Sequence, residues 1–421
     1  MSILAPRGTY DVMPDESANW IFVEEKAREI SWIYGYSEVR TPILKLRSFF
    51  SRGIGEETDI VEKEMYTFPD KKGRSLTLRP EGTASVVRAY LERKVPQDRL
   101  FKAYYIGPFF RYERPQAGRY RQFYQWGIEA IGSMDPALDV ETIKVAMAFY
   151  SSLGLKNLSC DINSIGCRNC RTPYKEALKE YFKDKVEHMC PDCRRRLDKN
   201  PLRILDCKRE SCIEPVKGSP VMIDFLCDDC RVHFENLKNY LSLLNIPFKL
   251  NPFIVRGLDY YTKTVYEVVS NSLGAQNSLC GGGRYDNLIE DLGGPSVPAV
   301  GFAAGLERAI MVMEKEGGAF TEKSKTEVFF ISMGVEAKKA ASKLLDGVRS
   351  AGIMAETDYL GRSIKTQMKE AGRLGAKFVA LIGDEELKSN SITVKDMVKK
   401  EQESVRTEEL VKYLKEKNQN K

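Results

Sequence analysis

The chain has 421 residues, 43% of them hydrophobic and 29% charged, and a formal net charge of +6. This length and composition are typical of a globular protein with two or three domains and exclude a disordered, fibrous or membrane-spanning chain. The mild positive charge suits a polyanionic partner, and the only two histidines, His188 and His233, lie in one Cys-rich region, which excludes Ser-His-Asp hydrolysis.

Short strands and a few helices make up the first 166 residues. Apolar residues recur at helical intervals from Trp20 to Tyr34, and the segment from Tyr36 to Pro42 alternates as a strand does before a proline ends it. The strand lengths and turn residues that follow are typical of an antiparallel sheet, so we expect an α+β domain. Further strands are expected at 65–68, 75–79, 100–110 and 123–131, and helices after Glu81 and Pro136.

A change of character after residue 166 divides this domain. Residues 167–250 hold eight of the ten cysteines among charged, helical stretches, and we expect them to form an inserted, mainly helical module. Strand-like sequence and an apolar helix then complete the first domain, which therefore comprises 1–166 and 251–320. From 326 to 421, strands alternate with helices, which predicts a separate, mostly parallel α/β domain.

The cysteines of the inserted module are paired along the sequence. No secretory signal and no apolar run long enough to cross a bilayer is visible, so we expect a cytoplasmic protein with no membrane partner, whose cysteines are rarely joined in disulfides. Eight thiols suffice for two tetrahedral Cys₄ sites, and we expect at least one structural zinc ion. The alternative is a set of reduced cysteines packed as small hydrophobic side chains. The pairs are Cys167 and Cys170, Cys190 and Cys193, Cys207 and Cys212, and Cys227 and Cys230.

Phosphate binding needs a device other than a glycine-rich loop at a helix start, because the chain has neither a Walker motif nor Gly-x-Gly-x-x-Gly after a strand. The hairpin expected at 110–132 carries several arginines and aromatic residues, and guanidinium groups pair with phosphate oxygens and stack on purines. A solvated basic hairpin remains the alternative. Arg308 follows a Gly/Ala-rich turn and could also reach a phosphate, although these glycines could serve close packing alone.

Two glutamates and one short segment are candidates for binding a small substrate. Glu81 follows a strand at a Pro/Gly turn and Glu129 ends the hairpin, so either carboxylate could accept an ammonium group, although such residues are usually solvated caps. Residues 256–262 concentrate an arginine, an acid and two tyrosines, which is unusual for a structural strand.

Five segments resemble one enzyme family. GYSEVRTPIL (35–44), FRYERPQAGRYRQFYQWGIE (110–129) and GFAAGLERAI (301–310) are similar to motifs 1, 2 and 3 of the class II aminoacyl-tRNA synthetases. RGLDYYTKTVYEV (256–268) and CGGGRYDNLI (280–289) resemble the two signatures of the histidyl-tRNA synthetases. The resemblance covers nearly the whole chain and implies a class II catalytic core followed by an anticodon-binding domain. A structural zinc ion is not part of the general pattern of this family.

The resemblance implies the reaction and its site. ATP, with Mg²⁺, would convert L-histidine to histidyl-adenylate with release of pyrophosphate, and histidine would then pass to the 3′ end of tRNA(His). Motif 1 implies a homodimer. Carried over by position, Arg111, Arg256 and Arg308 would be catalytic and would bind ATP together with Glu113. Histidine would be bound by Glu81, Gly82, Thr83, Gln125, Glu129, Tyr260 and Tyr261, and the acceptor end of the tRNA by Arg114, Gln116, Arg119 and Arg121.

Two other functions fit part of the pattern. A regulatory subunit of the histidine-biosynthetic phosphoribosyltransferase keeps the same core, but it lacks the anticodon-binding domain and usually has a degraded RGLDYY segment, and both features are intact here. An RNA-sensing module of a regulatory kinase would carry kinase signatures, which the sequence lacks. Histidine-dependent pyrophosphate exchange separates the ligase from a binding protein.

Overall fold

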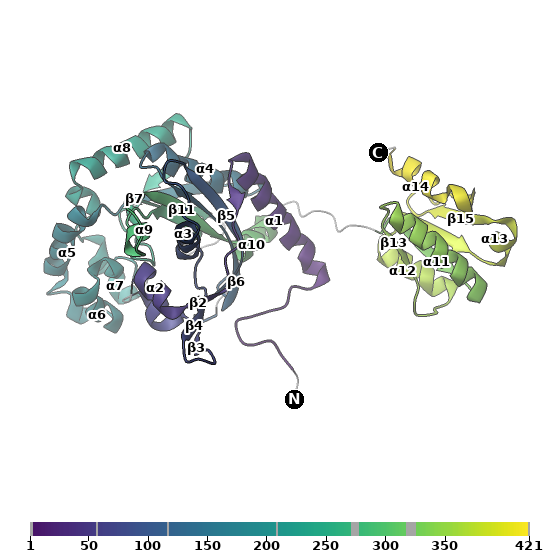
Figure 1. Cartoon of the computed structure of the whole chain (residues 1–421), viewed down its shortest axis with the longest axis horizontal. Helices are drawn as coiled ribbons and strands as arrows, with labels where there is room; N and C mark the ends of the chain where they lie inside the picture. The colour runs from purple at the N-terminus through teal and green to yellow at the C-terminus, as the bar shows by residue number, and fades with distance from the viewer. Residues whose placement is uncertain are drawn as a thin grey trace. The chain divides into compact units, whose positions relative to one another are not determined.

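The structure, a computed structural model, describes residues 3–55, 58–115, 118–207, 209–270, 278–316 and 326–419. It divides into two compact units, Met1–Thr321 and Glu322–Lys421, each of which has its own main sheet (Figure 1). None of the helices in these described ranges is long and apolar enough to cross a membrane.

An eight-stranded sheet forms the centre of the first unit. Its five inner strand pairs are antiparallel, which confirms the prediction, but the two edge pairs, β1 with β5 and β7 with β8, are parallel. The edge strand β1 has two residues and lies inside the segment predicted from Tyr36 to Pro42, whereas β8 has three residues, too few for an alternating pattern to reveal it. In spatial order the strands are β1 (Ser37–Glu38), β5 (Phe101–Phe110), β6 (Gln122–Ile131), β11 (Ala299–Gly305), β10 (Ser278–Arg284), β9 (Thr262–Ser270), β7 (Leu158–Ser164) and β8 (Phe248–Leu250).

Four helices cover one face of this sheet and bury its apolar side chains. Trp126, Ile128 and Phe302 point to that face and belong to one hydrophobic core with residues of the helices. The helix predicted after Pro136 begins there because the Asp135 carboxylate accepts a hydrogen bond from the Ala137 amide at 2.9 Å. The helices are α1 (Pro14–Ile33), α4 (Pro136–Ser152), α8 (Asp228–Leu243) and α10 (Leu306–Glu316).

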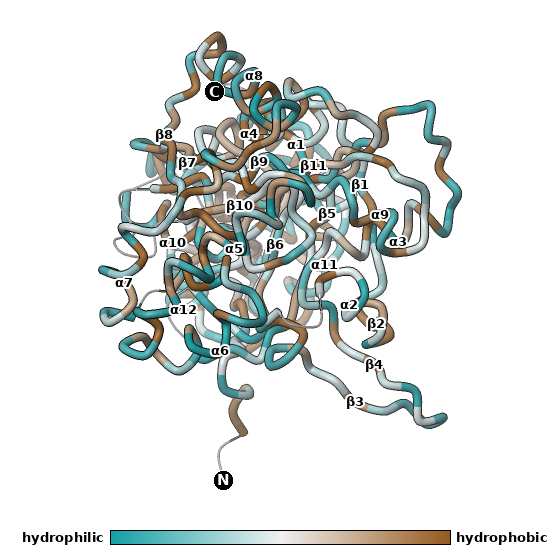
Figure 2. The backbone as a smooth tube through the Cα atoms, turned by 90° about the vertical axis from the view of Figure 1, so that its left-hand side faces the viewer, coloured by the Kyte–Doolittle hydropathy of each residue, from teal (hydrophilic) through white to brown (hydrophobic). Residues whose placement is uncertain are grey.

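Shorter elements lie over the opposite face. Val87 and Tyr90 of α3 (Thr83–Glu92) pack there against Ile131 and Ala299. A three-stranded sheet adjoins them, and Figure 2 shows its β3–β4 hairpin standing away from the body with a hydrophilic turn. These elements are β2 (Leu44–Leu46), α2 (Arg47–Ile54), the π-helical turn η1 (Ile60–Glu64), β3 (Thr67–Pro69), β4 (Ser75–Leu78) and α9 (Leu288–Asp291).

The Cys-rich region between β7 and β8 is helical, as predicted, and we call its residues 167–230 the Cys module. It has a small hydrophobic core of its own, built partly of cysteines. Figure 1 shows its first helices gathered at one end of the unit. Its elements are α5 (Arg168–Phe182), η2 (Val186–His188), α6 (Pro191–Lys199), η3 (Pro201–Ile204), α7 (Glu210–Lys217), η4 (Met222–Phe225) and the start of α8.

The second unit has a five-stranded sheet flanked by helices. The prediction of a mostly parallel sheet was wrong for half of it: two strand pairs are parallel and two are antiparallel. The last strand, β16, escaped prediction because its residues are mostly exposed and polar. In spatial order the strands are β13 (Ala355–Thr357), β12 (Val328–Ser332), β14 (Phe378–Ile382), β15 (Ser391–Asp396) and β16 (Gln402–Arg406), and the helices are α11 (Val335–Ser350), α12 (Ile364–Arg373), α13 (Asp384–Ser389) and α14 (Leu410–Gln419).

Candidate active site

The face of the eight-stranded sheet that turns away from its four helices is lined with glycines. Successive side chains of a strand point to opposite faces, and residues paired across strands point to the same one. Glu129 pairs with Gly301 and Glu267 pairs with Gly281, so both carboxylates share the side of these glycines. We call this side the glycine face; it carries Gly127, Gly281, Gly283, Gly301 and Gly305.

These glycines make room for side chains of the predicted site. A Cβ atom added to Gly281 would collide with the guanidinium of Arg256, and one added to Gly301 would collide with the carboxylate of Glu129. A Cβ atom on Gly82, itself a predicted site residue, would collide with the ring of Tyr105. At these three positions, glycine is therefore required by close approach and not by backbone conformation.

Glu81 and Glu129 form a buried acidic pair. The Thr83 hydroxyl donates to Glu129 Oε1 at 2.7 Å, and the Tyr285 hydroxyl donates to Oε2 of the same residue. Glu81 accepts from the Ala84 amide at 3.1 Å. Burial raises the pKa of Glu81 to about 7 and that of Glu129 to about 8, although their hydrogen-bond donors act in the opposite direction. A cationic ligand would stabilise the ionised form of both carboxylates.

Tyrosine rings stand beside this acidic pair. The ring centroids of Tyr260 and Tyr261 lie 4.9 Å apart, and Tyr285 lies 5.7 Å from Tyr260. The Tyr260 hydroxyl donates to Glu81 Oε2 at 3.5 Å. Within the described part of the chain the buried Oε1 atom of Gln125 has no hydrogen-bond partner, so it is free to accept one from a ligand. All seven residues predicted to bind histidine are therefore in the described structure, and Glu81, Thr83, Glu129 and Tyr260 form one connected group.

Arg256 lies on the glycine face and pairs with Glu267. Burial by itself lowers the pKa of Arg256, but Glu267, Tyr261 and Cys280 together outweigh it and leave the pKa raised. The buried Nε atom of Arg256 has no hydrogen-bond partner in the described residues. A permanently charged guanidinium with a donor to spare is suited to an anionic ligand.

Arg111 and Glu113 follow β5 directly. Arg111 Nε donates to the Pro80 carbonyl at 2.9 Å, and its guanidinium lies 5.4 Å from the ring centroid of Phe123. Glu113 lies between two arginines, with oxygens 3.7 Å from Arg111 Nη1 and 3.5 Å from Arg119 Nη1. The two residues of this hairpin that are predicted to bind ATP, Arg111 and Glu113, thus contact one another.

Arg308 connects the two other arginine sites. Arg308 lies in the first turn of α10. Its Nε donates to the Gly118 carbonyl at 3.4 Å, and its Nη1 donates to the carbonyl of Ser278. Burial and the charge of Arg119 lower the pKa of Arg308, and Glu267 and Glu113 act in the opposite direction. Gly118 lies in the hairpin loop after Glu113, and Ser278 begins β10, against which Arg256 packs, so Arg308 contacts both of these elements.

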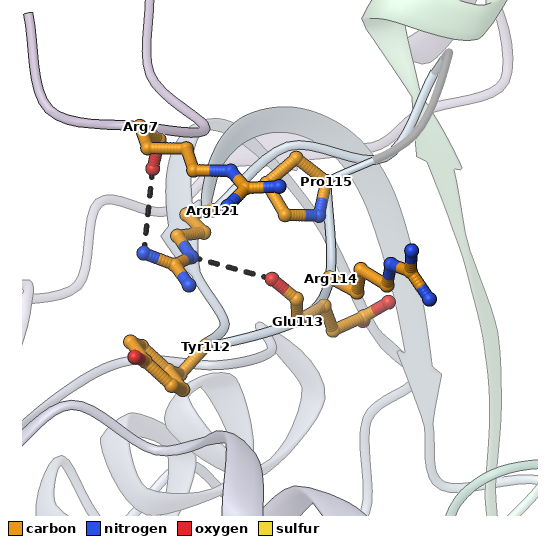
Figure 3. A pocket seen from close by; sticks show the side chains of 6 residues that line it. All are labelled: Arg7, Tyr112, Glu113, Arg114, Pro115 and Arg121. Carbon is orange, nitrogen blue, oxygen red and sulfur yellow. Dashed lines mark hydrogen bonds between the residues drawn. The ribbon is translucent and has the colours of Figure 1, made fainter.

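The residues predicted to meet the acceptor end of the tRNA divide into two groups. Arg114 and Arg119 are exposed, whereas Arg121 donates to the Glu113 carbonyl at 3.3 Å and stacks on Tyr112 at 4.1 Å, so it supports the loop from within. Gln116 lies outside the described residues. An open cavity of about 390 Å³ lies beside this loop. Figure 3 shows the side chains that line it, those of Arg7, Tyr112, Glu113, Arg114, Pro115 and Arg121.

The eight cysteines of the Cys module form two groups of four, in each of which all sulfur atoms lie within 4.8 Å of one another. Individual sulfur pairs lie 3.5 to 3.9 Å apart, for example Cys167 with Cys170 and Cys190 with Cys207. These separations are far longer than the S–S bond of about 2.05 Å in a disulfide. The groups are Cys167, Cys170, Cys227 and Cys230, and Cys190, Cys193, Cys207 and Cys212.

Sequence reasoning did not single out three residues of this site. Tyr105 lies over Gly82 and Gly127, Tyr285 donates to Glu129, and Glu267 pairs with Arg256. The quoted signatures contain Tyr285 and Glu267, but their spacing alone did not show which side chains they would contact. The alternating pattern of β5 placed Tyr105 in a strand without showing which face it would occupy.

A largely antiparallel sheet of this kind, with an arginine-bearing hairpin and a polar, glycine-lined face, defines a class II aminoacyl-tRNA synthetase catalytic domain. A family model described as histidyl-tRNA synthetase matches residues 8–169 and 227–309, and one described as an anticodon binding domain matches residues 327–417. The chain belongs to the histidyl-tRNA synthetase family and is therefore an aminoacyl-tRNA ligase. Residues 170–226, most of the Cys module, lie outside the matched ranges.

Individual relatives agree with this assignment. The histidine–tRNA ligases of Halothermothrix orenii and Pelotomaculum thermopropionicum are 51% and 50% identical to the chain, each over 98% of it and over 99% and 97% of their own lengths. The crystal structure of apo S. aureus histidyl-tRNA synthetase is 41% identical and has a TM-score of 0.83, covering 98% of this chain and 100% of that one.

Proposed function

We propose that the chain binds L-histidine and ATP on the glycine face, joins them as histidyl-adenylate with release of pyrophosphate, and transfers histidine to the 3′ end of tRNA(His). One observation carries the proposal. Two buried carboxylates, Glu81 and Glu129, share this face with Arg256, and Arg308 donates to the carbonyl of Ser278 in β10, the strand against which Arg256 packs. The face thus offers acceptors for a cationic amino acid beside donors for a phosphate chain.

The acidic pair is suited to the nitrogen groups of histidine. Glu81 would accept the α-ammonium group, and the fully buried Glu129 would hold the imidazole deeper in the site. Tyr260 and Tyr261 would enclose the ring, and Gln125 Oε1 would receive one of its N–H groups. Thr83 would hold Glu129 in place through its hydrogen bond. Gly82, which has no side chain, would leave room for the Tyr105 ring at the start of α3.

The three arginines are suited to the adenylation step. The histidine carboxylate oxygen attacks the α-phosphorus of ATP, a new O–P bond forms, and the bond to the β-phosphate oxygen breaks as pyrophosphate leaves. Arg111 and Arg256 would hold the α-phosphate, and Arg308 the γ-phosphate, while Glu113 would lie near the adenine. Guanidinium groups placed in advance stabilise charge as it grows on phosphate oxygens, so no protein nucleophile is needed.

ATP would bring Mg²⁺ with it. The carboxylate oxygens of Glu113 and Glu267 lie beside arginines, so the site has acidic groups that could accept hydrogen bonds from water molecules bound to the ion. The ion would supply positive charge for the departing pyrophosphate when bound. Arg256, which already lies against the sheet at Gly281, would provide a fixed cation at the α-phosphate.

The tRNA would meet both units. The exposed side chains of Arg114 and Arg119, with Gln116, would contact the acceptor end, while Arg121 would support their loop. The second unit, which matches the anticodon binding domain, would hold the other end of the tRNA. Lysine and arginine contacts to phosphates position RNA without reading bases.

Each group of four cysteines would hold a structural Zn²⁺ ion. Four thiolates about 2.3 Å from a central zinc ion are separated by about 3.8 Å along each edge of the tetrahedron. The observed sulfur separations of 3.5 to 3.9 Å fit that geometry. Zinc would cross-link segments of the Cys module that are far apart in the sequence.

A homodimer and a cytoplasmic location complete the proposal. Helix α1, which comes directly before the segment that resembles motif 1, leaves Trp32 79% and Ile21 57% exposed, and a second copy could bury them. Sedimentation at micromolar concentration would test the dimer. Eight thiols without a disulfide suit a reducing compartment.

Histidine-dependent exchange of labelled pyrophosphate into ATP tests the central proposal. We expect exchange with histidine and none with the other amino acids, followed by aminoacylation of tRNA(His). Absence of exchange from a folded protein that binds histidine would favour a regulatory binding protein instead.

A further inference from the structure

The loop of residues 256–261 carries Arg256, Tyr260 and Tyr261 but belongs to no helix or strand. Among the described backbone-to-backbone hydrogen bonds it takes part in one, from the Asp259 amide to the Ile54 carbonyl at 3.4 Å. Buried backbone groups need partners, and a loop with so few of its own must be held by side chains. Those side chains come from the Cys module.

Arg171 holds the end of the loop. Its three donor nitrogens contact three backbone carbonyls: Nε donates to Ile165 at 3.2 Å, Nη1 to Asp259 at 3.4 Å, and Nη2 to Tyr261. Two of these carbonyls lie in the loop, one of them on a tyrosine proposed to enclose histidine. A planar guanidinium with donors on several sides can bridge carbonyls in this way, whereas an ammonium group cannot.

Arg203 and Asn200 hold the beginning and the middle of the loop. Arg203 Nη1 donates to the Arg256 carbonyl at 2.9 Å, and Asn200 Nδ2 donates to Asp259 Oδ1 at 3.1 Å. The Arg203 side chain is only 13% exposed, so this hydrogen bond is largely shielded from water. The carbonyl that Arg203 contacts belongs to Arg256, which is proposed to hold the α-phosphate of ATP.

These donors are placed by the two cysteine groups. Arg171 directly follows Cys170 of the first group, and Arg203 lies between Cys193 and Cys207 of the second. Arg196, in the same stretch, donates to Asp59 at 2.8 Å and so joins the second group to the segment before η1. Each cysteine group therefore lies close in sequence to an arginine that contacts the 256–261 loop.

We propose that Arg171 and Arg203 are positioning residues for adenylation, which fix the 256–261 loop from the Cys module. Arg171 sets the place of Tyr261 and so serves histidine binding, and Arg203 sets the place of Arg256 and so serves the attack on the α-phosphate. This inference rests on the proposed roles of Tyr261 and Arg256. It assigns the module a part in the activation of histidine that needs no contact with the tRNA.

Paired substitutions in the intact chain test the inference. Arg171→Met is compared with Arg168→Met on the same helix, because the Arg168 side chain is 61% exposed and forms an ion pair with Asp291, outside the 256–261 loop. Arg203→Met is compared with Arg195→Met, because Arg195 is 46% exposed and pairs with Asp192 inside the module. Pyrophosphate exchange gives kcat and the KM for histidine, calorimetry gives the Kd for histidine, and metal analysis shows whether the module is intact.

The two variants should fail in different ways. We expect Arg171→Met to raise the KM and Kd for histidine about tenfold, and Arg203→Met to lower kcat about 10- to 100-fold with less than about a threefold change in the Kd for histidine, since small displacements of reacting groups carry costs of this size. Both controls should behave as the wild type. Backbone amides of residues 256–261 should exchange hydrogen faster in both variants.

The possible results are distinguishable. Folded, metal-bound Arg171→Met and Arg203→Met proteins with wild-type constants would overturn the inference while leaving the proposed function intact. Full activity of Arg256→Met would instead overturn the proposed function. Should Arg171→Met fail to fold, Arg171→Lys keeps the charge but not the bridge; a raised KM for histidine would then support the inference and an unchanged KM would overturn it.

Discussion

The glycine face and the Cys module keep their side chains in place by different means. On the glycine face, the register of β6, β11, β10 and β9 decides which residues meet, and the other face of the same sheet is anchored in a large apolar core. The core of the Cys module has fourteen buried residues, of which five are cysteines. Thiols thus replace apolar side chains there, and the proposed zinc ions would add cross-links to this small core.

Because the two regions are held in different ways, we expect some substitutions to impair the reaction and others to impair stability. Changes on the glycine face should impair the reaction while the sheet persists, because the helices hold it from behind. Changes in the cysteine groups should unfold the module first and affect the reaction through the 256–261 loop. Four substitutions, in order of decreasing effect, test this separation.

Loss of one cysteine group should have the largest effect. Structural zinc contributes about 10 kcal/mol or more to the folding of small domains, so Cys193→Ser should release about one equivalent of zinc per chain and unfold part of the module. Metal analysis and thermal unfolding would measure both changes. Cys160→Ala is the control, because Cys160 is buried in the main core outside both groups. Less than a tenth of an equivalent of zinc in the wild-type protein would contradict the metal sites altogether.

Arg256→Met should be the most severe change on the glycine face. We expect kcat for pyrophosphate exchange to fall about 100- to 1000-fold, which corresponds to about 3 to 4 kcal/mol, because a fixed cation at the α-phosphate would be lost. The Kd for histidine should change much less. Calorimetry beside exchange kinetics would measure the two quantities, and equal losses in both would contradict the assigned role of Arg256.

Gly281→Ala should displace Arg256 without removing it. The new Cβ atom would collide with the end of a flexible side chain, so the guanidinium should move while the strand stays. We expect kcat to fall about 10- to 100-fold, as for a reacting group displaced by about 1 Å, with little change in melting temperature. Gly347→Ala, at a helix position with nothing near the added atom, should leave kcat unaltered. A large fall in melting temperature for Gly281→Ala would show that the stability of the sheet depends on the residues of the reaction site, contrary to the proposed separation.

More of the glycine face than of the Cys module could be predicted from the sequence. Alternating residues predicted β5 and β6 to within about a residue, and the resemblance identified Arg256, Tyr260 and Tyr261. The pairing of the cysteines in space, Cys167 and Cys170 with Cys227 and Cys230, was not predicted, because spacing along the chain does not show which pairs meet.

Two further kinds of feature escaped prediction for related reasons. Tyr105 lies over Gly127 of the neighbouring strand β6, and only the sheet register shows that contact. Arg171 and Arg203 look like ordinary surface arginines in a charged, helical stretch, and the carbonyls of the 256–261 loop that they contact lie more than fifty residues away. Contacts that depend on long-range closure of the chain were therefore the ones missed.

The pH dependence of stability should show the smallest effect and distinguishes the two regions without any ligand. Burial raises the pKa of Glu129 to about 8 from an ordinary value of 4.5, so between these pH values the folded protein holds a proton that the unfolded chain has released. The free energy of unfolding should therefore fall as pH rises through this window, and the loss should level off above pH 8.

Glu129→Gln should remove this contribution. Its melting temperature should decline less than that of the wild type between pH 6 and pH 9, by a few degrees, which corresponds to about 1 kcal/mol or more. Glu180→Gln, at a 72% exposed side chain of the Cys module, should leave the wild-type slope unchanged. An identical slope in Glu129→Gln would mean that Glu129 is already ionised in the free protein. The charged form of the acidic pair would then be stabilised by groups of the protein itself and would not require the cation of the substrate.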